Sequence, residues 1–198
     1  MWFNQQKLRS LRARLILKNK SQNTSSEQND TDSTQNTASA QTGSSAQNAT
    51  PSDAQIAAIV VAANNVDINA GKLAEKMSNN QEVKDFAKHM EADHSAVNQQ
   101  ATALVKKLRV TPEESETSQS LTNDGKENIS NLKGQKGAEF DRAYVDNEVA
   151  YHQAVIDAMN QTLIPNAQNA ELKETLVKVK SLFEAHLAHA KQLQASLR

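Results

Sequence analysis

The sequence predicts an all-α protein, a four-helix bundle with one long crossover connection between its second and third helices. Four segments repeat apolar residues at intervals of three and four, which is the spacing of an amphipathic helix. Two short turns and one long polar connection join these segments. No strand pattern competes with the helical one, so we expect a single helical architecture.

The composition limits how large the core is and which chemistry it supports. The chain has 198 residues, of which 37% are hydrophobic and 4% aromatic, and this suits one domain with a tail and an aliphatic, alanine-rich core. It has no cysteine, which excludes disulfides, thiolate metal sites and thiol nucleophiles. Any metal ion must therefore be held by nitrogen and oxygen atoms.

Residues 1–20 form a basic leader with six Lys or Arg residues and no acid. Its longest apolar run is Leu15–Leu17, whereas a secretory signal needs about 7–15 apolar residues. Three interpretations stay open: a signal that is degenerate or truncated by a wrong start site, a short basic helix that contacts an anionic membrane surface, and a disordered leader. No transmembrane segment is predicted, and no nucleic-acid partner is expected because only the leader is basic.

Residues 21–51 are predicted to be a disordered linker. Positions 21–50 contain no Ile, Leu, Val, Phe, Met, Trp or Tyr, and are mostly Ser, Thr, Asn, Gln and Ala. Such a stretch cannot bury enough apolar surface to offset the entropy lost on ordering. The predicted domains are thus the leader, this linker, and a bundle over residues 52–198.

The first two helices are predicted over 53–78 and from Asn80 to Leu108. Ser52 and Gln55 form a potential capping box at the start of the first helix. The second helix follows the turn at 79–80, and the only polar member of its apolar stripe is His94. That histidine should therefore face the core.

The second pair of helices follows a long polar connection over 109–137, in which we expect one short helix at about 121–132. The third helix is predicted over 138–163, with Pro165 ending it, and the fourth begins after Asn169. On the fourth helix the only polar member of the apolar stripe is again a histidine, His186.

Polar residues at similar distances from the two turns should lie at one level of an antiparallel bundle. By this count Asp67, His94, Glu148 and His186 all fall near mid-helix, although Asp67 borders its apolar stripe. Three further residues share a helical face with them at spacings of three or four, namely Glu91, His152 and His189. The spacing is typical of metal ligands in a bundle, and Asp93 is placed to orient a histidine.

This pattern resembles ferritin-like bundles, in which two single glutamates and two Glu-x-x-His pairs enclose two metal ions. Glu91 to His94 matches one such pair, and Glu148 matches a single glutamate. Asp67 stands where the other glutamate would be, and His186 to His189 replaces the second pair with His-x-x-His. With fewer carboxylates, the resemblance favours Zn, Cu or a single Fe or Mn over an oxygen-activating di-iron centre.

A closer resemblance, over about residues 52–197, is to a bacterial ferritin-like family that is described only as a domain of unknown function. It is carried by three motifs: Met90-Glu91-Ala92-Asp93-His94 with Asn98, Phe140-Asp141 with Tyr144 and His152, and His186-Leu187 with Ala190. Members are often labelled outer membrane or exported proteins, which implies the periplasm or cell envelope. Because a clear signal is missing, a cytoplasmic location is the alternative. Ferritin-like bundles also often pair as homodimers.

Three functional hypotheses remain open. The first is a metal-binding protein that stores or buffers a transition metal under stress. The second, less favoured because carboxylates are few, is a metal-dependent oxidoreductase. The third is a structural or partner-binding bundle, in which buried histidines only fix the packing or sense pH.

Overall fold

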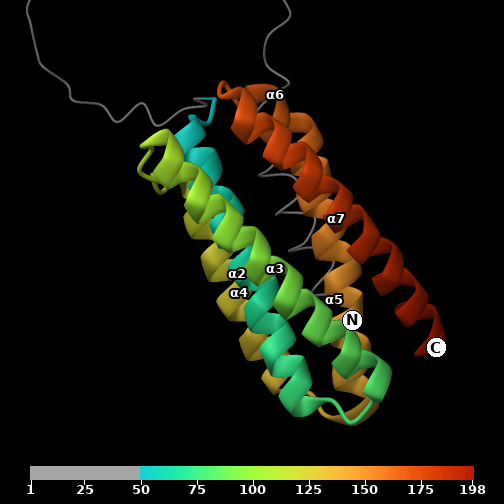
Figure 1. Cartoon of the computed structure of the whole chain (residues 1–198). Coiled ribbons are helices and arrows are strands. Elements are labelled where there is room, and N and C mark those ends of the chain that lie inside the picture. The colour runs from blue at the N-terminus through green and yellow to red at the C-terminus, as the bar shows by residue number, and fades with distance from the viewer. Residues whose placement is uncertain (1–49) are drawn as a thin grey trace, which may run out of the picture.

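The computed structural model describes residues 50–198, which form a set of long helices (Figure 1). In chain order these are α2 Asp53–Met77, α3 Gln81–Leu108, α4 Glu116–Lys133, α5 Gly137–Ala158, a π-helical turn Met159–Leu163, α6 Ile164–Asn166 and α7 Ala170–Ser196. No strand occurs within 50–198, so the all-α prediction is confirmed for that range. The predicted leader, and the predicted linker except for its last two residues, lie outside it.

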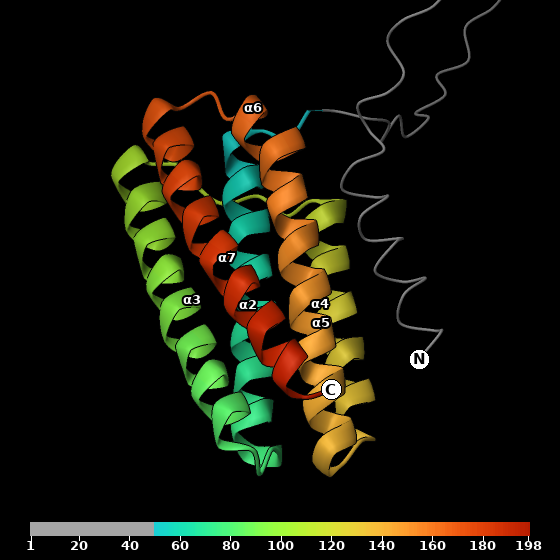
Figure 2. The same ribbon diagram turned by 90° about the vertical axis from the view of Figure 1, so that its right-hand side faces the viewer.

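The helices are arranged as two antiparallel hairpins, one of α2 and α3 and the other of α5 and α7 (Figures 1 and 2). α2 also packs against α5, and α3 against α7, so these four helices surround a common core. α4 lies mainly against α2 and also reaches α5. In the part of the chain that the structure describes, no helix is both long enough and apolar enough to cross a membrane.

Polar side chains cap the starts of α2, α3 and α7, and the sequence predicted the first of these caps. The capping box of Ser52 and Gln55 is present at the start of α2. Asn80 and Asn169 cap α3 and α7, and each side-chain oxygen accepts hydrogen bonds from two backbone N–H groups of the first turn. Asp53 also accepts hydrogen bonds from the backbone N–H groups of Gln168 and Asn169, so α2 and α7 begin at the same end of the bundle.

The prediction of one short helix at 121–132 was too cautious, because α4 spans Glu116–Lys133. Its apolar side is narrow, with Leu121 and Leu132 fully buried. Gly125 allows close packing on α2, since a Cβ atom there would lie 2.8 Å from a methyl carbon of Val66. The long connection is therefore largely a fifth helix that covers α2.

Pro165 does not end the third helix at Leu163, as the sequence predicted. The helix widens into a π-helical turn over Met159–Leu163, where the N–H of Ile164 donates to the carbonyl of Met159, and continues to Asn166. Proline has no N–H and its ring crowds the carbonyl four residues earlier. A wider turn relieves that conflict, so the chain bends before α7 without losing helical structure.

Two apolar clusters make up the core. The first lies toward the end where α2 begins and includes Ile56, Leu176 and Phe183. The second lies toward the turn between α2 and α3 and includes Phe86 and Phe140. Along α2, α3, α5 and α7 one or more buried polar residues lie between the two clusters, and these residues include the candidate site.

Candidate metal centre

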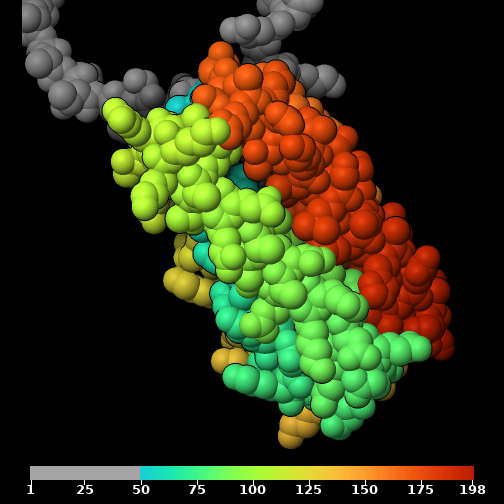
Figure 3. Space-filling view, in the orientation of Figure 1, coloured from blue at the N-terminus to red at the C-terminus, as the bar shows by residue number. Residues whose placement is uncertain are grey.

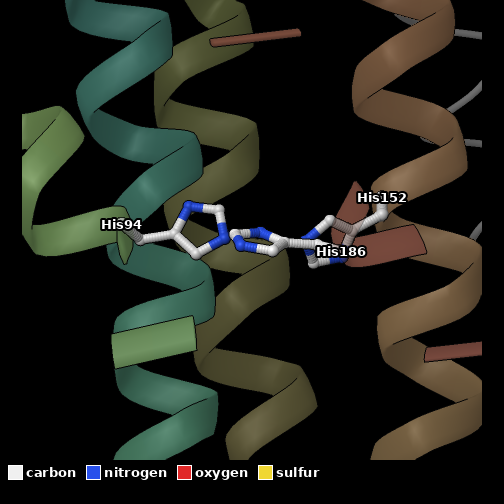
Figure 4. Close-up of side chains that lie close together, drawn as sticks. All are labelled: His94, His152 and His186. Carbon is white, nitrogen blue, oxygen red and sulfur yellow. The ribbon is translucent and has the colours of Figure 1, made fainter. Parts of the chain in front are cut away.

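Five ionisable side chains meet at mid-height in the bundle, one each from α2, α3 and α7 and two from α5. All five are buried, with at most 5% of the residue exposed: Asp67, His94, Glu148, His152 and His186. We call this set the polar layer. Figure 4 shows its three histidines pointing toward one another from α3, α5 and α7.

The ligand atoms of the polar layer form two overlapping groups. In one group His94, His152 and His186 each offer a ring nitrogen, and these atoms lie within 4.8 Å of one another. In the other group Asp67, Glu148 and His152 offer ligand atoms within the same distance. Because His152 belongs to both, the five side chains form one continuous cluster of nitrogen and oxygen donors.

A chain of asparagines fixes the protonation of His94. Asn64 donates its side-chain N–H to Asn98 at 3.0 Å, so its own Oδ1 is the acceptor that faces Nδ1 of His94 at 2.8 Å. Asn98 in turn donates to Asn65 at 2.9 Å. Nδ1 of His94 therefore carries the proton, and Nε2 keeps a lone pair, 3.5 Å from Oδ2 of Asp67.

The other two histidines are oriented in the same way. Nδ1 of His152 donates to the backbone carbonyl of Glu148 at 3.0 Å, and Nε2 of His186 donates to Oδ2 of Asp93 at 2.9 Å. Each ring thus uses one nitrogen for an outer partner and presents the other as a lone pair. The sequence prediction that Asp93 orients a histidine is confirmed.

Seven ligand-type atoms of the polar layer are buried and have no fixed hydrogen-bond partner among the described residues, although the carboxyl groups of Asp67 and Glu148 lie close enough to share a proton. They are Nε2 of His94, Nε2 of His152, Nδ1 of His186, and both carboxyl oxygens of Asp67 and of Glu148. Buried polar atoms are nearly always paired, and leaving one unpaired costs about 1–3 kcal/mol. A cluster made only of acceptors needs protons or a cation.

Burial keeps the histidines neutral. Desolvation, followed by the charges of the neighbouring histidines, lowers the pKa of His94 to about 2, and desolvation lowers the pKa of His152 to about 3. Burial also lowers the pKa of His186, although Asp93 opposes that shift. All three rings are therefore neutral at pH 7 and can act as ligands. These pKa directions argue against the hypothesis that the layer senses pH through histidines near their ordinary pKa.

Burial has the opposite effect on the two carboxyl groups. It raises the pKa of Glu148 to about 8, with a smaller opposing contribution from Asp67. Burial, followed by the charge of Glu148, raises the pKa of Asp67 well above its ordinary value. In the absence of a cation these carboxyl groups hold protons near neutral pH, and a bound cation would displace those protons.

Two of the predicted ligands lie outside the polar layer. Glu91 is half-buried, and its carboxylate lies 3.7 Å from the Nζ atom of Lys72 on α2. His189 is exposed, with its ring edge-to-face against Phe86 at a centroid distance of 5.0 Å. The other five predicted residues, Asp67 and His152 among them, are brought together in the polar layer.

Sequence reasoning missed Asn64, which is fully buried and orients His94. One signal was available, because Asn64 precedes Asp67 by three residues and so shares its helical face. Gly71 lies four residues beyond Asp67 on that face, and a Cβ atom there would lie 2.8 Å from the carbonyl oxygen of Ala87. Gly71 thus lets α3 approach α2 closely enough for these contacts.

The fold and site define an all-helical protein with a buried layer of histidines and carboxyl groups. The chain belongs to the family described as Domain of unknown function (DUF4142), whose model matches residues 37–193. Searches of curated proteins and of solved structures gave no match.

Proposed function

We propose that this protein binds a divalent transition-metal ion in the polar layer, and that it buffers or stores the metal rather than acting as an enzyme. The observation that carries the proposal is the set of seven buried acceptor atoms without fixed partners. A cation bound within either group would be reached by three ligand atoms at once, because the ligand atoms of each group lie within 4.8 Å of one another. Loss of two carboxyl protons would balance the charge of a divalent ion.

The ligand types narrow the choice of metal. Three neutral imidazoles suit Zn, Cu or Fe, and adding carboxylates extends the set to Mn. Mg²⁺ and Ca²⁺ prefer six or more oxygen ligands, which this layer does not supply. We therefore propose Fe, Mn, Cu or Zn.

The enclosure of the polar layer inside the bundle favours metal storage over metal-dependent catalysis. His94 and His152 are fully buried, and apolar clusters cover the layer from both ends. A catalytic metal needs an open coordination position that substrate can reach. Metal buffering under stress needs only binding and release. As part of the same proposal we assign that role to the cell envelope, an expectation that rests on the family resemblance alone.

Elemental analysis of the full chain tests the proposal. The protein is purified without affinity tag or chelator and then incubated in turn with Fe²⁺, Mn²⁺, Cu²⁺ and Zn²⁺. We expect near-stoichiometric binding of at least one metal, and loss of that metal in the double variant His94→Leu with His186→Leu. The matched control is Gln99→Ala with Gln192→Ala, two exposed positions on the same helices, which should keep the metal.

The same variant tests the alternative of a purely structural layer. Replacing a buried polar group with an apolar side chain of similar size is often neutral or stabilising. If the wild type binds none of the four metals and the variant is as stable as the wild type, the layer only fixes packing. That result would overturn the proposal.

A further inference from the structure

His186 is the most exposed member of the polar layer, and it bonds across to Asp93 of α3. α3 and α7 lie side by side on this face of the molecule (Figure 3). The side chain of His186 is 7% exposed, whereas those of His94 and His152 are fully buried. Asp93, which accepts the hydrogen bond of His186, is 44% exposed. An ion that enters the layer without unfolding the bundle would therefore meet Asp93 and His186 first.

Two exposed histidines stand on the same seam, one helical turn away from this entry point. His89 precedes Asp93 by four residues on α3, and His189 follows His186 by three on α7. Their ring centroids are 6.4 Å apart, with an angle of 50° between the ring planes. Both rings also lie close enough for their charges to lower the pKa of His186.

Contacts along the seam hold α3 and α7 in this register. Lys107 forms an ion pair with Glu171 at 2.7 Å near one end, and Ser196 donates to Glu82 at 3.2 Å near the other. Phe86 packs edge-to-face against the ring of His189. His89 and His189 thus lie opposite each other across the seam with tilted rings, and both residues are exposed.

We propose that His89 and His189 form an outer binding site for the divalent transition-metal ion, which then passes by way of Asp93 and His186 into the polar layer. This inference rests on the proposed function of that layer. Two imidazoles favour Zn, Cu, Ni and Fe over Mg²⁺ and Ca²⁺, so the outer site selects the same class of ion. With two protein ligands it binds more weakly than the layer beneath it, as an entry site must.

Zn²⁺ binding to four forms of the full chain tests this inference: wild type, His89→Gln with His189→Gln, His94→Leu with His186→Leu, and all four substitutions together. Calorimetry counts the bound ions, and rapid mixing with a chromophoric zinc indicator gives the uptake rate. We expect the wild type to bind one tight and one weaker equivalent. The outer double variant should lose only the weaker one and fill the inner site several-fold more slowly.

The inner double variant should keep only the weaker equivalent, and the fourfold variant should lose both. If the wild type binds neither Zn²⁺ nor any of the other three metals tightly but keeps a weak Zn²⁺ equivalent that needs His89 and His189, the outer site stands and the proposed function fails. If the outer double variant matches the wild type in equivalents and rate, the outer site is overturned and the proposed function stands.

A measurement on the unmodified chain covers the case in which the inner variant does not fold. Zn²⁺ titration followed by imidazole nitrogen and carbon NMR signals should shift those of His89 and His189. Unchanged signals for both residues across the titration would overturn the outer site independently of any variant.

Discussion

The polar layer and the apolar clusters on either side of it are equally buried, yet they are stabilised in different ways. In the clusters, side chains such as Phe86 and Phe140 find all their partners within the chain, because apolar packing needs only contact and exclusion of water. In the layer, seven acceptor atoms lack a fixed partner among the described residues. The apolar clusters need no bound ion or proton for their stability, whereas the polar layer depends on protons or a cation.

This difference suggests how each region responds to change. Truncating an apolar side chain leaves a cavity, and its cost does not depend on pH or on metal. A substitution in the polar layer alters how many protons or cations the folded protein binds, so its effect on stability should vary with pH and with metal concentration. We make four predictions about this difference, in order from the largest expected effect to the smallest.

Phe140→Ala should have the largest effect, a loss of about 3–5 kcal/mol in the free energy of unfolding. Phe140 is fully buried, and its ring is stacked on Tyr144 at a centroid distance of 6.4 Å. Urea unfolding followed by circular dichroism measures the loss. Metal bound per folded molecule should stay unchanged, which separates the cluster from the layer. A loss below about 1 kcal/mol would mean that this cluster is packed less tightly than the structure shows.

The stability of the metal-free protein should fall as pH rises from about 6.5 to 8, by roughly 1 kcal/mol per pH unit for each carboxyl group that stays protonated. The pKa of Glu148 is about 8 in the folded protein and 4.5 ordinarily, so over this interval the unfolded state binds fewer protons. The histidines act in the opposite sense. Their folded pKa values lie below 6.5, so their contribution to stability is lost as pH falls below 6.5.

Glu148→Gln sharpens this pH test, because glutamine keeps the shape of the side chain without its proton. Urea unfolding in the presence of a chelator should show a shallower decline above pH 6.5 for the variant than for the wild type. An unchanged slope would show that Glu148 does not hold its proton in the folded state. Addition of the bound metal should reverse the decline, since the metal replaces those protons.

Asn64→Ala should weaken metal binding about tenfold while leaving the apolar clusters intact. The variant removes the acceptor that keeps the proton on Nδ1 of His94, so the lone pair on Nε2 is no longer fixed. Competition with a chromophoric chelator measures the affinity. The matched control is Asn65→Ala, because Asn65 is exposed and accepts from Asn98 only at the outer end of the asparagine chain. Equal affinities for both variants would contradict the orienting role of Asn64.

The sequence was sufficient to predict the helices that have broad apolar stripes. It was also sufficient to predict the residues of the polar layer that interrupt those stripes. His94 and His186 were predictable because each is the one polar member of an apolar repeat. α4 was underestimated because it buries only a narrow side that includes Leu121 and Leu132, and its packing depends on the close approach of Gly125 to Val66. The π-helical turn before Pro165 likewise reflects how the chain relieves a local conflict, which a periodic pattern does not encode.

Prediction of the site residues from the sequence was limited by a different factor, the packing of one helix on another. Glu91 has the spacing of a Glu-x-x-His ligand, yet its side chain lies at the edge of α3, where Lys72 of α2 provides an opposite charge. Residues three apart share one side of a helix but differ by about 60° around its axis, so Glu91 can lie beside His94 without lying on the buried stripe. The packing of α2 on α3 leaves Glu91 at the edge of that stripe. Asn64 was missed for the same reason, because its contact with His94 exists only between two helices.

The smallest effect is expected at the surface, from the ion pair of Lys107 and Glu171. Nζ of Lys107 lies 2.7 and 2.9 Å from the two carboxylate oxygens, but the side chains are 67% and 44% exposed. A double-mutant cycle with Lys107→Ala and Glu171→Ala should give a coupling energy below about 1 kcal/mol, because water and salt screen exposed charges. The coupling should shrink further in high salt and should not depend on metal. A coupling that persisted in high salt would show that the α3 and α7 seam excludes water around this ion pair.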